Sequence, residues 1–273
     1  MKKQINFFLA LFFIAAFSWY IFLFEPNNLQ VEKLEIKMEN LPFSFNGMKI
    51  VQLSDLHSKN FGGKEKKVLK IIEQINPDFI FITGDFIDRA TKDIESCQEF
   101  WRALSEKYEN RVYGVMGNHE YWNPNYHSIK QNLIDSGINI LNNENVKLIK
   151  DDDFIYLIGV DDPHSSYDNL FLAMKGISNK NILKILLAHS PEIIEDAKIK
   201  NINLILVGHT HGGQVKIPFV RPIWVPTKDH GKYASGLFKI NDSYLYVNRG
   251  VGVGFLPIRF NCPPEITLIK IEK

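Results

Sequence analysis

Acidic, amide and imidazole side chains recur at the ends of several short apolar runs in this sequence. The runs are typical of buried strands, and packing alone does not require such side chains where a buried strand ends. Carboxylate, amide and imidazole groups without a thiolate suit Mn, Fe, Zn or a similar divalent ion. Seven candidates are too many for one four-coordinate ion and predict two ions that share a bridging carboxylate. The candidates are Asp55, His57, Asp85, Asn118, His189, His209 and His211.

The spacing within this set favours convergence of the side chains. Asp55 and His57 are two residues apart, and His209 and His211 repeat that spacing. In an extended segment, side chains at i and i+2 face the same way, so we expect each pair to aim at one point. Glycines directly precede the candidates that follow two other strands, and a glycine allows close backbone approach beside a ligand.

The elements that must position these residues alternate between strands and helices, which predicts an α/β fold. Ligands of open α/β sheets bind outside the carboxyl ends of the strands, which is where the candidates fall. We expect strands at residues 31–37, 49–53, 79–83, 111–116, 146–150, 154–160, 182–188, 203–207, 214–217, 236–240, 244–248 and 265–271. We expect helices at residues 64–75, 92–108, 126–136, 169–174 and 191–198.

Four motifs in chain order, D-x-H, G-D, G-N-H-E and G-H-T-H, make the sequence similar to the calcineurin-like metallophosphoesterase family. The resemblance covers roughly residues 49–271 and implies a four-layer α/β/β/α sandwich with two packed sheets. It implies that Asp85 bridges two metal ions and that His119, beside a ligand, is the proton donor. The first ion would also be held by Asp55, His57 and His211, and the second by Asn118, His189 and His209.

Hydrolysis of a phosphodiester or pyrophosphate bond is the chemistry that such a site fits. Two cations neutralise the anionic phosphate and lower the pKa of a bridging water, so that hydroxide attacks phosphorus near neutral pH. His119 would then donate a proton to the leaving oxygen or stabilise it. Arg249 follows a late strand and is a candidate for binding a phosphate oxygen, with a surface arginine as the alternative.

Residues 5–24 form an uncharged apolar run of 20 residues. At about 1.5 Å per residue the run spans about 30 Å, the thickness of the hydrocarbon core. It is longer than a signal-peptide core of about 7–15 residues and lacks a small-residue cleavage site at its end, which favours an uncleaved single-pass anchor in the cell membrane. Lysines on both sides leave the side of the catalytic domain open.

This anchor sets the expected domain organisation. Residues 1–4 are a short tail, residues 5–24 the anchor, residues 25–48 a linker with the first strand, and residues 49–273 the phosphoesterase domain. Two apolar segments late in that domain, 217–226 and 251–260, suit contact with lipid, and covering of the core is the alternative. The residues that suggest lipid contact are Arg221, Trp224, Phe255, Leu256 and Arg259.

Composition limits the partners of the chain. Its 32 Lys and Arg against 31 Asp and Glu give a net charge of +1, so we expect no nucleic-acid partner. Two cysteines, Cys97 and Cys262, exclude a disulfide scaffold and leave their pairing open. The remaining histidines, His127, His164 and His230, lack ligand spacing, and we expect them to be ordinary packed or surface residues, with a position lining the cleft as the alternative for His164, which follows D-D-P after a strand. The sequence does not set the oligomeric state.

Only the resemblance to known families of enzymes indicates which class of substrate the protein acts on. The G-H-T-H motif departs from the protein phosphatases of the family. The anchor and the residues 261–265, N-C-P-P-E, resemble a bacterial membrane-anchored branch that includes UDP-2,3-diacylglucosamine diphosphatases of lipid A synthesis. The alternatives are an envelope enzyme acting on a phospholipid or wall polymer, and a membrane-tethered scaffold without activity.

Overall fold

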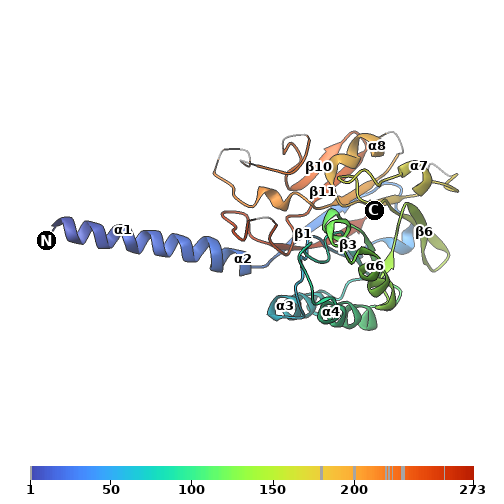
Figure 1. The fold of residues 1–273 in the computed structure, drawn as a ribbon. Helices are drawn as coiled ribbons and strands as arrows, with labels where there is room; N and C mark the ends of the chain where they lie inside the picture. The colour runs from blue at the N-terminus through green and yellow to red at the C-terminus, as the bar shows by residue number, and fades with distance from the viewer. Residues whose placement is uncertain are drawn as a thin grey trace.

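The computed structural model describes residues 2–178, 181–198, 201–218, 220, 222, 224–228, 231–254 and 256–273. A long apolar helix extends from the folded domain at the N-terminus, as Figure 1 shows. It comprises α1 (Lys2–Trp19), a π-helical segment (Tyr20–Phe24) and α2 (Glu25–Asn27). This helix is long and apolar enough to cross a membrane, and none of its apolar window is buried in the protein.

Two six-stranded sheets form the centre of the domain. The first is mostly parallel, and the last strand of the chain lies between the first two, parallel to one and antiparallel to the other. Its order is β1 (Gln30–Lys37), β12 (Glu265–Glu272), β2 (Met48–Leu53), β3 (Phe79–Thr83), β4 (Val112–Val115) and β5 (Asn139–Ile140). The second sheet runs β10 (Gly236–Ile240), β11 (Ser243–Val247), β9 (Leu204–Val207), β8 (Lys184–Leu187), β7 (Asp153–Gly159) and β6 (Glu144–Lys150).

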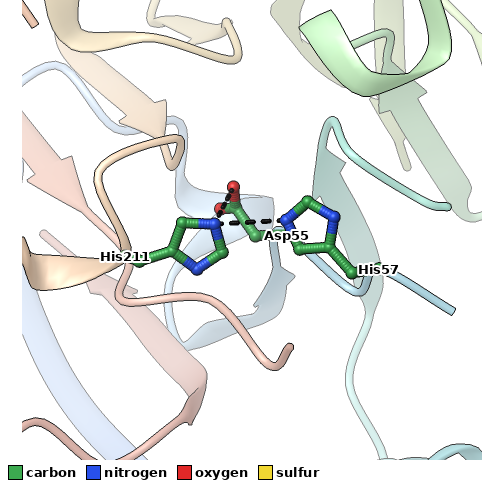
Figure 2. Close-up of side chains that lie close together, drawn as sticks. All are labelled: Asp55, His57 and His211. Carbon is green, nitrogen blue, oxygen red and sulfur yellow. Dashed lines mark hydrogen bonds and ion pairs between the residues drawn. The ribbon is translucent and has the colours of Figure 1, made fainter. Parts of the chain in front are cut away.

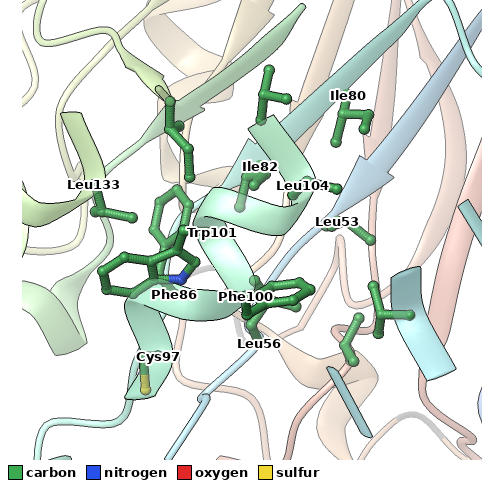
Figure 3. Packing of buried hydrophobic residues seen from close by; sticks show 14 of the residues in the cluster. Leu53, Leu56, Ile80, Ile82, Phe86, Cys97, Phe100, Trp101, Leu104 and Leu133 are labelled. Carbon is green, nitrogen blue, oxygen red and sulfur yellow. The ribbon is translucent and has the colours of Figure 1, made fainter. Parts of the chain in front are cut away.

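Helices cover the outer face of each sheet, which gives four layers (Figure 1). Residues such as Phe81 and Leu206 pack between the sheets, while Trp101 packs under the helices of the first sheet and Ile194 beside the second. Figure 3 shows the layer around Trp101. The helices are α3 (Gly63–Ile75), α4 (Ile94–Lys107), α5 (Asn118–Trp122), α6 (Tyr126–Asp135), α7 (Leu170–Ala173) and α8 (Ile194–Lys198).

Local signals explain where the longer helices begin. The Glu65 side chain accepts the backbone N–H of Gly62 at 3.0 Å and caps α3, and Asp93 caps α4 by accepting the N–H of Ser96 at 3.1 Å. These bonds satisfy N–H groups that have no partner inside the helix. Helix α3 then ends at Asn76, whose left-handed backbone (φ 49°) stops further helical bonding.

The four-layer α/β architecture confirms the expected fold class, and β3 has the predicted bounds. The prediction of a strand at residues 214–217 is wrong. Only Val215 pairs there, in an isolated bridge to Phe260, because the backbone at Gln214 is left-handed (φ 55°) and breaks the ladder. Both cysteines are free and buried, Cys97 on the inner face of α4 and Cys262 beside the loop after β9, so they do not pair. Residues Arg221, Phe255 and His230 lie outside the described residues.

Candidate metal centre

The structure brings all seven predicted ligands together where strands of both sheets end. Segments after β2, β3 and β4 of the first sheet and after β8 and β9 of the second contribute them. Figure 2 shows part of the cluster, in which the imidazoles of His57 and His211 face each other beside the carboxylate of Asp55. Each of the seven ligand candidates is at most 7 % exposed. A buried cluster of this kind needs a cation or extensive hydrogen bonding to be stable.

One half of the cluster contains only lone pairs at its centre. The Nδ1–H of His189 donates to the carbonyl of Thr83 at 2.8 Å, and the Nε2–H of His209 donates to the carbonyl of Pro226 at 2.9 Å. In the neutral rings, the unprotonated Nε2 of His189 therefore faces the unprotonated Nδ1 of His209 at 3.1 Å. Asn118 Oδ1 lies 2.9 Å and Asp85 Oδ2 3.5 Å from the same His189 nitrogen. A cation among these atoms removes their mutual repulsion.

The other half of the cluster brings two imidazoles and two carboxylates equally close together. The Nε2 atoms of His57 and His211 are 3.1 Å apart, Asp55 Oδ1 lies 3.5 Å from His211 Nε2, and Asp85 Oδ2 lies 3.6 Å from His57 Nε2. Two nitrogens bound to one ion at about 2.1 Å and near right angles would be about 3 Å apart, so this spacing fits a shared ion. The same oxygen, Asp85 Oδ2, faces both halves, which is the position of a bridging ligand.

The electrostatics of the centre favour neutral imidazoles. Burial lowers the pKa of His57 and of His209 well below the usual range and that of His211 to about 4. Burial, with Asp55 nearby, raises the pKa of Asp85. A neutral imidazole has the lone pair that a metal ion requires, and a cation offsets the cost of the charged Asp85 carboxylate. The donor set therefore fits two divalent ions.

The backbone conformation at the ligand candidates differs from the one expected from the sequence. Five of the seven candidates have left-handed backbones: Asp55, His57, Asp85, His209 and His211, with φ between 43° and 70°. The expectation of extended i, i+2 pairs is therefore wrong in its geometry. Asp55 and His57 both face the half that contains His211, whereas His209 and His211 face different halves. Such conformations are costly outside glycine and cluster at functional sites.

Glycines leave room for the ligands, as expected from the sequence. A Cβ on Gly208 would lie 1.8 Å from Ser54 Oγ and 2.4 Å from Asp55 Oδ2. A Cβ on Gly117 would lie 2.4 Å from Asp85 Oδ1, and one on Gly84, whose φ is +84°, would lie 2.5 Å from His189 Nδ1. No side chain fits at these three positions without displacing a ligand.

His119 lies beside the cluster and outside both halves. Its Nδ1 accepts the backbone N–H of Arg89 at 3.1 Å and lies 3.6 Å from a carboxylate oxygen of Asp88. The Asp88 oxygen is also 3.9 Å from His57 Nδ1. The ring of His119 is thus held by its Nδ1 edge, and no described residue bonds its Nε2. Burial lowers its pKa to about 4.

Two cavities flank the cluster and meet at His119, Trp122 and Gly254. The larger has a volume of about 1120 Å³ and is lined by Asp85, Asn118, His209 and His211 among the ligand candidates. The smaller has a volume of about 720 Å³ and is lined by polar groups that include Lys59 and Arg89. His164 lines the larger cavity, with its ring 4.4 Å from that of His209, so the alternative of a cleft position applies to it. The D-D-P-H run after a strand was the available signal.

Arg249 does not line either cavity, which corrects the substrate-binding role expected for it. Its guanidinium pairs with Glu265 of β12 and Glu32 of β1 and is not free for a substrate phosphate. Arg259, for which lipid contact and covering of the core were the two alternatives, is fully buried, in agreement with the second. Its guanidinium donates to the carbonyls of Cys262 (3.0 Å) and Gly250 (3.2 Å), among others. It therefore supports the loop whose Gly252 N–H bonds the carbonyl of Asp55 at 2.7 Å.

Fold and site together define a metal-dependent phosphoester hydrolase. The family model for calcineurin-like phosphoesterases matches residues 48–213, and the chain belongs to this family, which uses divalent metal ions. The sequence is 32% identical to the Bacillus subtilis protein named uncharacterized metallophosphoesterase YkuE, over 91% of this chain and 87% of that protein. It is 28% identical to Escherichia coli phosphodiesterase YaeI, over 82% of each chain. A Danio rerio transmembrane protein with metallophosphoesterase domain is 28% identical over 97% of this chain and 62% of its own length.

Proposed function

We propose that this protein hydrolyses a phosphodiester or pyrophosphate at two divalent ions while an N-terminal helix anchors it to the cell membrane. The observation that carries the proposal is the pair of cavities that meet at His119. A phosphomonoester has one substituent and needs one cavity. A diester or pyrophosphate has a substituent on each side of the reacting phosphorus, and each cavity accommodates one.

The ligand assignment follows the two halves of the cluster. Asp85 would bridge, because one of its oxygens faces both halves. When bound, the ions neutralise the phosphate and lower the pKa of water. The first ion would also be held by Asp55, His57 and His211, and the second by Asn118, His189 and His209.

His119 would act on the leaving group. Because its Nδ1 accepts the Arg89 N–H, the neutral ring carries its proton on Nε2, the edge without a described partner. That Nε2–H donates a hydrogen bond to the oxygen on which negative charge develops. In the overall reaction water supplies the oxygen of the new P–O bond, the P–O bond to the leaving group breaks, and the leaving oxygen departs with a proton.

The substrate we propose is lipid-linked, with UDP-2,3-diacylglucosamine as the specific candidate. The helix Lys2–Asn27, which can cross a membrane, supports a membrane substrate. The second candidate is a phospholipid or wall polymer of the cell envelope, which applies if the catalytic domain lies outside the cytoplasm. The facing lone pairs of His189 and His209 and the position of His119 argue against an inactive scaffold, because a scaffold does not need a metal centre beside an open cavity.

The test uses the full-length protein in detergent, loaded with Mn²⁺. We expect kcat/KM for bis-p-nitrophenyl phosphate to exceed that for p-nitrophenyl phosphate at least tenfold, with Asp85→Asn as the blank. Preference for the monoester would overturn the diester assignment, and activity of Asp85→Asn equal to wild type would overturn the bridging role. UDP-2,3-diacylglucosamine assayed in parallel separates the lipid A candidate from an envelope substrate.

A further inference from the structure

The larger cavity has two walls of opposite chemistry. One wall is the metal centre, including Asp85 and His209, and the other is apolar. Ligand sites are lined by side chains that match the ligand part they bind, so a phosphate needs only the first wall. The apolar wall consists of Val215, Trp224, Val225, Leu256 and Ile258.

This wall continues onto the surface of the protein. Trp224 is 65 % exposed and Leu256 51 % exposed, and Val220 on the same loop is 59 % exposed. Contiguous apolar surface of this kind marks a membrane or partner contact. Val225, by contrast, is 9 % exposed and lies inside. An apolar path therefore leads from the outer surface to the metal centre.

The path opens next to the N-terminal helix. The backbone N–H of Arg259 donates to the carbonyl of Ile21 at 3.0 Å, and the ring of Phe260 packs against those of Phe17 (5.6 Å) and Tyr20 (6.2 Å). These contacts are only a few residues from Leu256 and Ile258 in the chain. The wall therefore lies beside the last turns of the helix, at the depth where a membrane-spanning helix leaves the bilayer.

The same segment is tied to the metal centre. The side-chain amide of Gln214, three residues after the ligand candidate His211, donates to the carbonyls of Leu256 at 2.6 Å and Ile258 at 2.8 Å. The carboxylate of Glu25, at the end of the helix, accepts the backbone N–H of Cys262. Helix, apolar wall and ligand loop are thus one connected unit, and the wall is held at a fixed position relative to the ligand candidate His211.

We propose that the apolar wall binds an acyl chain of a membrane lipid, so that the lipid enters the cavity from the bilayer beside the helix and its phosphodiester reaches the metal centre. This inference rests on the proposed function and assigns the binding site of one substituent of the substrate, its acyl chain. Because the wall lies beside the helix that can cross the membrane, we infer that its ligand is a bilayer lipid and not a soluble apolar ligand or a protein partner.

Photolabelling from the bilayer tests the acyl site. The full-length protein is placed in phosphatidylethanolamine vesicles that contain phosphatidylglycerol with a diazirine in one acyl chain. After irradiation, labelled residues are mapped by mass spectrometry. We expect labels at Val225 and Ile258, inside the cavity, in addition to residues of the helix. Leu256→Glu and, separately, Trp224→Ser should reduce the cavity labels at least fivefold.

Ile149→Glu is the matched control. Ile149 is 70 % exposed on β6, at the opposite end of the domain from the helix (Figure 1), and the change should leave every label unchanged. Metal content and Tm show whether each variant is folded. Labels confined to the helix, or to the rim residues Trp224 and Leu256, overturn the proposal. Hydrolysis of bis-p-nitrophenyl phosphate in the same vesicles reports the proposed function separately, since labelling requires no turnover.

Discussion

Removal of the metal ions should lower the Tm of the full-length protein by about 10–20 °C. The reason is that the ligand cluster is unfavourable without cations. The unprotonated nitrogens of His189 and His209 face each other at 3.1 Å, and the Asp85 carboxylate, whose pKa is raised by burial, lies beside them. Chelation leaves these groups buried and mutually repulsive, and it also removes the binding free energy that favours the folded state.

The size of the expected Tm shift is estimated from the backbone strain at the ligand candidates and from the stabilisation that ion binding gives the folded state. Five left-handed residues at about 1–2 kcal/mol each cost about 5 kcal/mol or more, which ion binding must offset. Two ions, each at 100 times its Kd, stabilise the folded state by about 5 kcal/mol together. For a domain of this size 1 kcal/mol shifts Tm by about 2–4 °C, which gives the expected 10–20 °C.

The assay is thermal unfolding in detergent with Mn²⁺ or after chelation, with metal content measured on the same samples. His209→Ala should lower metal content and abolish most of the shift. His127→Ala, an exposed histidine away from the cluster, should keep the full shift. A metal-free sample whose Tm lies within 3 °C of the loaded protein would refute the reasoning, because the cluster would then be stable without cations.

Three further outcomes are expected. His119→Ala should keep both ions and lose turnover by about 10²–10⁴-fold, as for loss of a group that acts on the leaving oxygen; full turnover would remove His119 from the reaction. Gly208→Ala should cost about 3 kcal/mol or more and lower metal content, because its Cβ would lie 1.8 Å from Ser54 Oγ, whereas Gly63→Ala, with no atom within 4 Å, should change stability by less than about 1 kcal/mol. Cys97, with a pKa raised to about 12 by burial, should resist iodoacetamide at pH 8 in the folded protein, and rapid native alkylation at this residue would contradict its burial.

Local patterns in the sequence account for much of the fold. Strand β3 has the predicted bounds because its apolar run ends sharply at Gly84 and Asp85. The seven ligand candidates meet because strand ends of both sheets converge, which a sequence can indicate when chemistry follows each strand. Helix α5 was missed, since its five residues are too few for a periodic pattern and begin with the ligand candidate Asn118.

What escaped prediction is set by contacts between distant segments. The Glu120 carboxylate accepts the backbone N–H groups of Asp85 (3.0 Å), Ile87 (3.1 Å) and Gly117 (2.8 Å). These bonds join the segments after β3 and β4. These bonds fix the turn and so stabilise the left-handed φ at Asp85. Neither the φ nor the bonds can be predicted from the spacing of residues along the sequence.

The same reasoning explains why the sequence could not settle the roles of two arginines. Arg249 was expected to meet a phosphate, but β1 and β12 place Glu32 and Glu265 against it, from positions more than 200 and 16 residues away in the chain. Arg259, left between lipid contact and covering of the core, donates to carbonyl groups of the loop beside Asp55. A buried guanidinium with several carbonyl acceptors fixes a loop more firmly than an exposed one, since its loss would leave those acceptors unsatisfied. The exposed side chains of the proposed acyl site, Trp224 and Leu256, are therefore uncharged, while the Arg259 guanidinium is buried behind the loop that contacts Asp55.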